Sequence, residues 1–364
     1  MKLRSTAPSL SRTLAAAVII VCLLTACSGN DHVGRAKADH RAERGGATPT
    51  TMASRGSTPP TSTSSTTTTP STHLVDSICN GRAGITGLGV VTAPEVTEAS
   101  GIVASRRDPG VWWINNDSGD SARIFAVSEA GALLGTVDIP NARATDWEDI
   151  ASDGDSIFIA DIGDNRGTRD SVTIYAIETP SVTSGAGGSA SGTVRKLDAT
   201  ATKLTLTYPD GAHDAEALAF DPISGDLFVL TKDWSMKGVS GIYRTPARPL
   251  DPSDGAADGS GQGNRTGGTA ELERVGELSL PAGTLVTGAD ISPDGSLVAV
   301  RSYTSVNLFR RPPDIDVGTA LESVPCEAPL PPELQGESIG FAADGSNYVT
   351  ISEGKGQTLH RTHG

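Results

Sequence analysis

Four glutamates stand at matching positions of a repeated sequence pattern, which makes them candidates for one shared site. Each lies at the start of a short apolar segment that is expected to form a β-strand. Three of them precede an Ile or Leu by two positions and the fourth precedes Ile102 by four, so alternation along a strand points all four side chains to one face. These candidate metal ligands are Glu98, Glu148, Glu216 and Glu337.

Carboxylates that converge on one point repel one another, so they must be protonated, paired with a cation or bound to a metal ion. Oxygen ligands at variable distances suit Ca²⁺ better than Zn²⁺, which prefers His and Cys. The pattern therefore favours calcium, and a purely structural network of ion pairs is the alternative. Secondary candidates lie near the ends of the expected strands; they are Asp117, Asp161, Asp164, Asp290, Lys232 and Arg301.

Three of these secondary candidates have a specific expectation attached. Lys232 and Arg301 stand at matching strand ends and can pair with the glutamates in the structural alternative. Asp290 precedes Ile291 by one position, so it faces away from the glutamates unless a β-bulge turns it.

No nucleophile and base stand out as a catalytic pair. His213 adjoins Asp214 at a strand entry and is a candidate for a general base, the alternative being a histidine that bonds a nearby carboxylate. Four tryptophans near strand ends offer either a stacking platform for a sugar or peptide or packing between sheets; they are Trp112, Trp113, Trp147 and Trp234.

The elements that position these residues follow from an internal repeat. Five segments share a first strand, a turn with Asp-Gly or Asp-Pro, a second strand and a third strand, and Asp-Gly between apolar runs is a strong hairpin signal. The first strands are expected at 98–102, 147–150, 215–218, 288–291 and 336–339. In a β-propeller the first strand of each blade lines the central channel.

We therefore predict an all-β fold, a β-propeller with five blades, or six if an insert hides a sheet. The last repeat lacks a fourth strand, and the segment 84–92 can supply it and close the ring without an open edge. Gly/Ser-rich inserts at 181–192 and 251–268 are expected to be exposed loops.

The first 26 residues have the features of a signal peptide. Basic residues precede an apolar run from Leu14 to Leu24, which is too short to span a membrane. The following Leu24-Thr25-Ala26-Cys27 resembles the bacterial lipobox, which implies lipidation at Cys27 and anchoring by acyl chains at the outer face of the cell membrane. The alternative is an ordinary secretory peptide with a chance cysteine.

Residues 27–75 are rich in Ser, Thr and Pro and poor in large apolar residues, which predicts a disordered tether. The propeller is then expected to occupy 76–364. Cys22 leaves with the signal peptide, so Cys79 and Cys326 remain in the exported domain and are expected to form a disulfide that locks the closing strand, two unpaired thiols being the alternative.

Charge limits the partners. The chain has 43 acidic and 29 basic residues, a net charge of −14, so a nucleic acid partner is not expected. An anionic ligand would need a bound cation in order to approach the domain.

Four motifs carry a resemblance to known proteins: Glu98-Ala-Ser-Gly-Ile, Asp146-Trp-Glu-Asp-Ile-Ala, Asp161-Ile-Gly-Asp-Asn and His213-Asp-Ala-Glu-Ala-Leu. Over 84–362 the chain resembles secreted actinobacterial propeller lipoproteins of uncharacterised function. It is also distantly similar to phytase-like esterase and gluconolactonase-type propellers, whose divalent ion lies in the channel. No complete ligand set of these families can be matched residue by residue.

Two function classes follow. The first is a cell-surface lipoprotein whose propeller binds or scaffolds a small molecule, a glycan or a protein. The second is a metal-dependent hydrolase of phosphoesters, esters or lactones that uses the channel cation.

Overall fold

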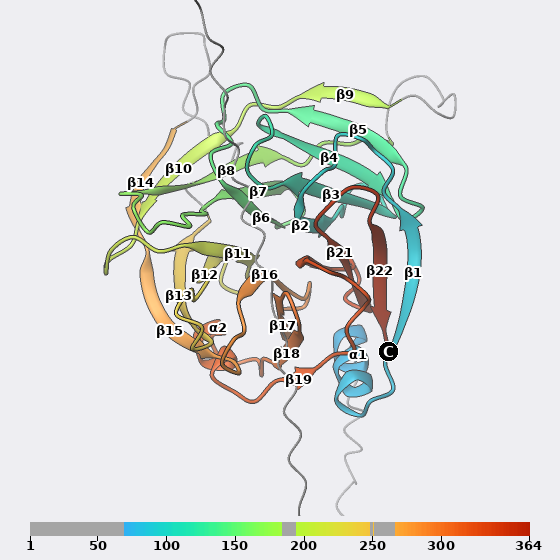
Figure 1. Cartoon of the computed structure of the whole chain (residues 1–364), viewed down its shortest axis with the longest axis vertical. Helices are drawn as coiled ribbons and strands as arrows, with labels where there is room; N and C mark the ends of the chain where they lie inside the picture. Colours follow the sequence, from blue (N-terminus) through green and yellow to red (C-terminus); the bar gives the residue numbers. More distant parts are fainter. Residues whose placement is uncertain (1–68, 184–193, 248–249, 251–265) are drawn as a thin grey trace, which may run out of the picture. The chain divides into compact units, whose positions relative to one another are not determined.

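The chain folds into a five-bladed β-propeller, as predicted (Figure 1). The structure is a computed structural model that describes residues 69–183, 194–247, 250 and 266–364. Five small sheets surround a common axis, and the first strand of each sheet lies nearest to that axis. Neighbouring first strands contact one another around a closed ring.

The blades are numbered here in chain order. Blade 1 consists of β2 (Ala99–Ala104), β3 (Val111–Asn116), β4 (Arg123–Ser128) and β5 (Leu133–Asp138). Blade 2 consists of β6 (Trp147–Ser152), β7 (Ser156–Asp161), β8 (Val172–Glu178) and β10 (Thr202–Thr207). Blade 3 consists of β11 (Ala215–Phe220), β12 (Asp226–Thr231), β13 (Val239–Pro246) and β15 (Glu273–Ser279).

Blade 4 consists of β16 (Val286–Ile291), β17 (Leu297–Ser302), β18 (Val306–Arg310) and the short β19 (Cys326–Glu327), with the helix α2 (Val317–Leu321) between the last two strands. Blade 5 consists of β20 (Gly336–Phe341), β21 (Asn347–Ser352), β22 (Thr358–His363) and β1 (Gly84–Val90). The strand before blade 1 thus completes blade 5, which confirms the predicted closure of the ring. Its antiparallel pairing runs from Gly84 with His363 to Val90 with Thr358.

A disulfide links the closing segment to the neighbouring blade. Cys79 and Cys326 form the pair, with their Cα atoms 5.1 Å apart. Cys79 ends the helix α1 (Pro70–Cys79) directly before β1, and Cys326 lies in the outer strand of blade 4. The predicted pairing is therefore present in the structure, at the seam where the ring closes.

The ordered domain begins earlier than the expected boundary at Asp76. Thr69 caps α1, and Pro70 occupies its first turn, where a proline costs no hydrogen bond. Leu74 and Val75, which the predicted tether includes, are fully buried against blades 4 and 5. α1 therefore begins before the expected boundary at 75, and its apolar face is too short to stand out in the sequence beside the Ser/Thr-rich run that precedes it.

The sequence does not predict two of the strands, because each follows a Gly/Ser-rich insert. β9 (Arg195–Asp198) adds in parallel to β5, and β14 (Thr266–Glu271) adds in parallel to β10. The end of the second insert, 266–268, is thus strand and not loop. Most of both inserts, the signal peptide, Cys27 and nearly all of the expected tether lie outside the described residues.

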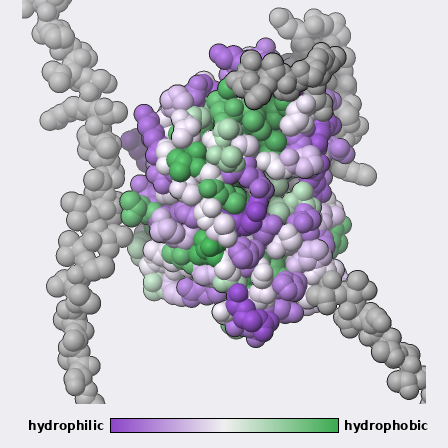
Figure 2. Space-filling view, turned by 90° about the vertical axis from the view of Figure 1, so that its right-hand side faces the viewer, coloured by the Kyte–Doolittle hydropathy of each residue, from purple (hydrophilic) through white to green (hydrophobic). Residues whose placement is uncertain are grey.

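The core is divided among the interfaces between blades. Each of five apolar clusters of described residues is built from two neighbouring blades, for example Trp113 of blade 1 with Trp147 of blade 2. On the side of the domain seen in Figure 2, polar and apolar residues are interspersed. Among the described residues, no helix is long and apolar enough to span a membrane.

Candidate functional site

The mouth of the central channel is the end at which the first strands begin and the second strands finish. There Trp147 pairs with Asp161, Ala215 with Thr231, and Gly336 with Ser352. Residues just before a first strand or just after a second strand therefore meet at this mouth. The loops that leave the second strands form its rim.

In every blade, the pairing register between the first and second strand shifts near the second residue of the first strand. This shift changes the direction of the side chains near the mouth. The register skips Glu148 in β6, Glu216 in β11 and Glu337 in β20. A β-bulge re-aims the extra residue relative to simple alternation. The three glutamates are 2%, 4% and 5% exposed, respectively.

The structure brings Glu148 together with two aspartates. Ligand oxygens of Asp117, Asp146 and Glu148 all lie within 4.8 Å of one another. Asp117 directly follows β3 of blade 1, and Asp146 directly precedes β6 of blade 2. This trio of carboxylates is called the acidic cluster below.

Gly163 covers the acidic cluster from the loop that follows β7. A Cβ atom at this position would lie 2.0 Å from Glu148 Oε1 and 2.6 Å from Asp146 Oδ2. Only glycine leaves room for the two carboxylates here, so the loop backbone is held directly against them.

The charge of Glu148 has no compensation from hydrogen bonds. Among the described residues, no hydrogen-bond or ion-pair partner contacts its carboxylate. Burial raises its pKa well above the ordinary value, and the neighbouring Glu216, Asp117 and Asp146 raise it further. Burial also raises the pKa of Asp117 to about 7. A group of this kind is stable only when it is protonated or when a cation joins it.

Glu216 belongs to a second group at the mouth, which contains a cation. Lys232 Nζ donates to Glu216 Oε1 at 2.6 Å and to Tyr303 Oη at 2.9 Å. Burial raises the pKa of Glu216 to about 8, although Lys232 opposes this effect. Glu216 and Tyr303 raise the pKa of Lys232, so the amine stays protonated. The expected pairing of Lys232 with a channel glutamate is thus present as this ion pair.

Glu337 is the third buried glutamate and has another carboxylate as its neighbour. Burial and Glu353 raise its pKa well above the ordinary value. Glu353 directly follows β21, the position that Lys232 has after β12. Lys232 of blade 3 and Glu353 of blade 5 therefore place opposite charges at the same position, directly after the second strand.

Glu98 lies outside the acidic cluster. It is exposed at the rim, and Ser100 occupies the bulge position of blade 1 that Glu148 occupies in blade 2. In blade 4 that position is held by Thr287, whose hydroxyl donates to the carbonyl of Gly336 at 3.0 Å. The alternation rule fails for Glu98 because it takes no account of the bulge.

Asp290 does not reach the mouth either. It lies half-buried further along β16, where its carboxylate accepts from the backbone N–H groups of Ile291 at 2.8 Å and Phe341 at 2.7 Å. Burial raises its pKa to about 7. Asp290 lines a small cavity with Arg106 at the opposite end of the channel.

Asp161 and Asp164 are buried near the acidic cluster but bond their own blade. Asp161 pairs with Arg169 at 2.8 Å and accepts from the N–H of Asp146 at 3.2 Å. Asp164 accepts from the N–H of Arg169 at 2.7 Å. Both side chains shape the loop around Gly163, so their contacts are structural.

Arg301 ties blade 4 to blade 5 instead of pairing with a channel glutamate. It is fully buried and donates to Glu333 at 2.7 Å, and His360 bonds the other oxygen of that carboxylate at 2.8 Å. The Nη2 atom would lie 1.5 Å from a Cβ at Gly336, so glycine is required at the start of β20.

His213 is likewise separate from the acidic cluster. Its Nε2 bonds Asp210 at 2.9 Å and Tyr243 Oη at 3.0 Å, and its ring meets Tyr208 edge to face. This arrangement corresponds to the alternative expectation, a histidine bonded to a nearby carboxylate.

Sequence reasoning overlooks Asp149, which directly follows Glu148. Its carboxylate accepts from the N–H groups of Ile150 at 2.8 Å, Leu218 at 2.9 Å and Ala289 at 3.2 Å. It thereby links blades 2, 3 and 4 across the channel. Asp146 is also overlooked as a ligand, although its place directly before β6 could have indicated it.

Of the four tryptophans, three pack between blades and one is available at the rim. Trp112, Trp113 and Trp147 are buried, whereas Trp234 is 49% exposed. The packing alternative therefore describes three of them, and only Trp234 of the four offers an exposed ring for stacking.

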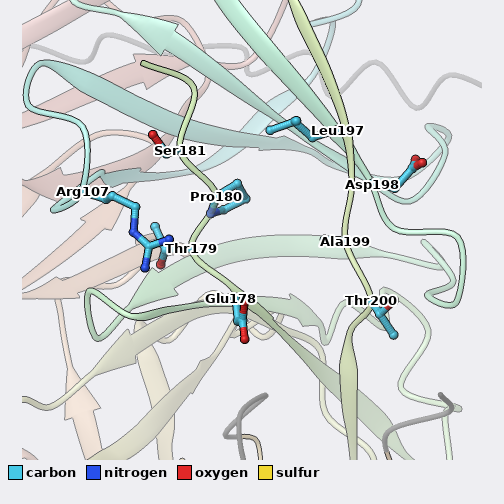
Figure 3. Close-up of a pocket in the computed structure, with 9 residues that line it drawn as sticks. All are labelled: Arg107, Glu178, Thr179, Pro180, Ser181, Leu197, Asp198, Ala199 and Thr200. Atoms are coloured by element: carbon cyan, nitrogen blue, oxygen red, sulfur yellow. The ribbon is translucent and has the colours of Figure 1, made fainter. Parts of the chain in front are cut away.

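One cavity of about 450 Å³ lies away from the mouth, on the outer part of blades 1 and 2 (Figure 3). Arg107, Pro180 and Leu197 are among its lining residues. Its described lining contains no group of converging carboxylates, and it borders the insert that lies outside the described residues. The acidic cluster at the mouth is therefore the stronger candidate site.

Comparisons with known proteins give similar solved structures at low sequence identity. No family model and no curated protein matches the chain. Among solved structures, the PQQ-bound aldose sugar dehydrogenase of Streptomyces coelicolor is similar, with 12% identity and a TM-score of 0.41, over 77% of this chain and 98% of that chain. A luciferin-regenerating enzyme is similar with 8% identity and a TM-score of 0.41, over 77% of this chain and 96% of that chain.

Proposed function

We propose that this protein is a cell-surface lipoprotein whose propeller holds a divalent cation at the channel mouth and uses it to bind a ligand. The observation that carries the proposal is the buried carboxylate of Glu148, which lies beside Asp117 and Asp146 and has no hydrogen-bond or ion-pair partner among the described residues. A cation that joins the three oxygens removes this electrostatic cost.

The donor set favours calcium as the ion. The acidic cluster offers oxygen ligands only, and Ca²⁺ accepts more of them, at more variable distances, than Mg²⁺ or Zn²⁺. Three protein carboxylates leave coordination positions for water or for an oxygen of the ligand. The surface role rests on Cys27 and the segment before it, which lie outside the described residues.

A calcium titration of the thermal unfolding tests the cation. Calcium should raise the melting temperature of the EDTA-treated protein, and Asp146→Asn should lose most of that increase because one ligand is neutralised. An unchanged melting temperature in calcium for the wild-type protein would contradict the proposal.

Membrane fractionation tests the anchor. The Cys27→Ser variant should move from the membrane fraction to the medium, because it lacks the thiol that the lipid would modify. Retention in the membrane would refute the lipid anchor but leave the cation site untouched.

A metal-dependent hydrolase is the second candidate, and the open coordination positions favour it. Catalytic metal sites keep a position for water or substrate, and Lys232 with Tyr303 stands beside the acidic cluster. Hydrolysis of p-nitrophenyl phosphate or acetate that is lost in EDTA and in Asp146→Asn would select this candidate. No turnover in the presence of calcium would leave the binding function.

A further inference from the structure

The side of the mouth formed by blades 3 and 4 carries a wall made of Lys232, Tyr303 and Trp234. The ammonium of Lys232 is 2.9 Å from Tyr303 Oη and 5.0 Å from the centre of that ring. It also lies 4.9 Å from the centre of the Trp234 ring. The Trp234 ring therefore holds the buried cation by a cation–π contact, and Tyr303 holds it through its hydroxyl.

The wall is fixed by the ends of two strands. Lys232 directly follows β12 and donates its N–H to the carbonyl of Asp214 at 2.9 Å, while Tyr303 directly follows β17. Trp234 Nε1 donates to Asp214 Oδ2 at 2.5 Å, which orients the indole. The wall is thus preformed, and half of the Trp234 surface faces solvent.

Hydrogen-bond donors remain on this wall. Tyr303 Oη accepts from Lys232, so its own hydrogen is left to donate, and no acceptor for it is found among the described residues. The ammonium has three hydrogens and gives two of them to Glu216 and Tyr303. Hydrogen-bond donors on blades 3 and 4 therefore face the same mouth as the three carboxylates of blades 1 and 2, and Glu148 lies inside the electrostatic range of Lys232, whose charge is paired with Glu216.

We propose that the ligand is an organic oxyanion, a carboxylate or a phosphate monoester, bound between the channel cation and the wall. One ligand oxygen completes the coordination of the cation, a second accepts from Tyr303 and Lys232, and the organic part lies on Trp234. This inference rests on the proposed cation site. Without the cation, the carboxylates of the mouth would repel such a ligand.

Reciprocal binding follows from this arrangement and provides the test. A ligand that touches both the cation and the wall must raise the affinity for calcium by the same factor by which calcium raises the affinity for the ligand. Calorimetric titration of the purified protein with calcium, in the presence of benzoate or of phenyl phosphate, measures that factor. We expect a gain in calcium affinity of about 5-fold to 100-fold, the usual range of coupling between sites.

The variants assign the effect to the wall. Tyr303→Phe should reduce the gain at least several-fold relative to its own titration without anion, because the ring stays and only the donor is lost. Tyr348→Phe, the same change at a tyrosine buried in blade 5, should keep the full gain. Trp234→Ala should abolish the advantage of benzoate over acetate.

The outcomes separate the two proposals. Calcium binding without any gain from either anion would overturn the oxyanion inference and leave the cation site intact. An absence of calcium binding would overturn both. An equal gain in calcium affinity in Tyr303→Phe and in the wild type would also overturn the inference. The anion that gives the larger gain, benzoate or phenyl phosphate, shows whether the ligand carries a carboxylate or a phosphate.

Discussion

Glu148 is the central residue of the channel mouth. It is 2% exposed and belongs to the acidic cluster, yet it gains no hydrogen bond among the described residues. Groups of this kind lower the stability of a fold, and they persist where they serve binding or catalysis. Its substitution should therefore separate stability from cation binding.

Glu148→Gln should leave the metal-free protein as stable as the wild type or more stable, because it removes a buried charge and keeps the shape. The same variant should lose most of the calcium response. At one hundred times the Kd, a cation that binds only the folded state adds about 2.7 kcal/mol, or on the order of 5–10 °C of melting temperature.

Glu98→Gln is the matched control, because Glu98 is an exposed glutamate at the same mouth. Its calcium response should equal that of the wild type in differential scanning calorimetry. If Glu98→Gln and Glu148→Gln lost the calcium response to the same extent, the response would come from negative charge near the mouth in general and not from the acidic cluster.

Asp149 has a structural role that can be tested independently. Its carboxylate accepts three backbone N–H groups, from blades 2, 3 and 4. In Asp149→Asn an amide NH₂ replaces one acceptor, so a buried donor loses its partner, which costs about 1–3 kcal/mol. Urea unfolding should report this loss, and a change below about 0.5 kcal/mol would contradict the role.

The three buried glutamates could be predicted from the sequence as channel residues, because their spacing from the next apolar residue is constant. Glu98 is misplaced by the same reasoning, since the bulge in the first strand of its blade shifts the alternation and leaves no mark in the residue types. Asp290 lies away from the mouth, as the alternation rule indicates. Tyr303 and Gly163 could not be found, because Tyr303 acts on Lys232 of another blade and Gly163 acts through the fold of its loop against Glu148.

At the scale of elements, the closure of the ring is the feature that a substitution can disrupt most directly. β1 completes blade 5 from the other end of the described domain, and the Cys79–Cys326 disulfide joins the segment before it to blade 4. The repeat and its Asp-Gly turns predict this closure. β9 and β14 escape prediction because parallel edge strands after an insert carry no turn signal.

Reduction of the disulfide should lower the melting temperature. The two cysteines are separated by 247 positions in the sequence, and loss of a native disulfide typically costs about 2–5 kcal/mol. A Cys79→Ala/Cys326→Ala variant should match the reduced wild type and show no further response to reductant. Equal melting temperatures with and without reductant in the wild type would contradict this role.

At the scale of the whole molecule, the channel carries several buried acids, and stability should therefore depend on pH. Burial raises the pKa of Asp117 and of Asp290 to about 7. Between about pH 4 and pH 7 the folded protein binds protons that the unfolded chain has released, so stability falls as the pH rises.

Thermal unfolding in EDTA should accordingly give a lower melting temperature at pH 8 than at pH 5. Calcium should reduce or reverse this difference, because its ligands must be deprotonated. Asp290 lies away from the mouth, so Asp290→Asn should reduce the pH dependence in EDTA but leave the calcium response unchanged. A melting temperature in EDTA that rises from pH 5 to pH 8 would contradict the assignment of raised pKa values to the channel acids.

The central claim is that the acidic cluster holds one divalent cation, and elemental analysis of the purified protein tests it most directly. After equilibrium dialysis against calcium, the wild type should contain one calcium ion per chain, and Asp146→Asn and Glu148→Gln should contain far less, whereas Glu98→Gln should match the wild type. A wild-type protein without bound calcium, or equal calcium contents in all four proteins, would contradict that claim.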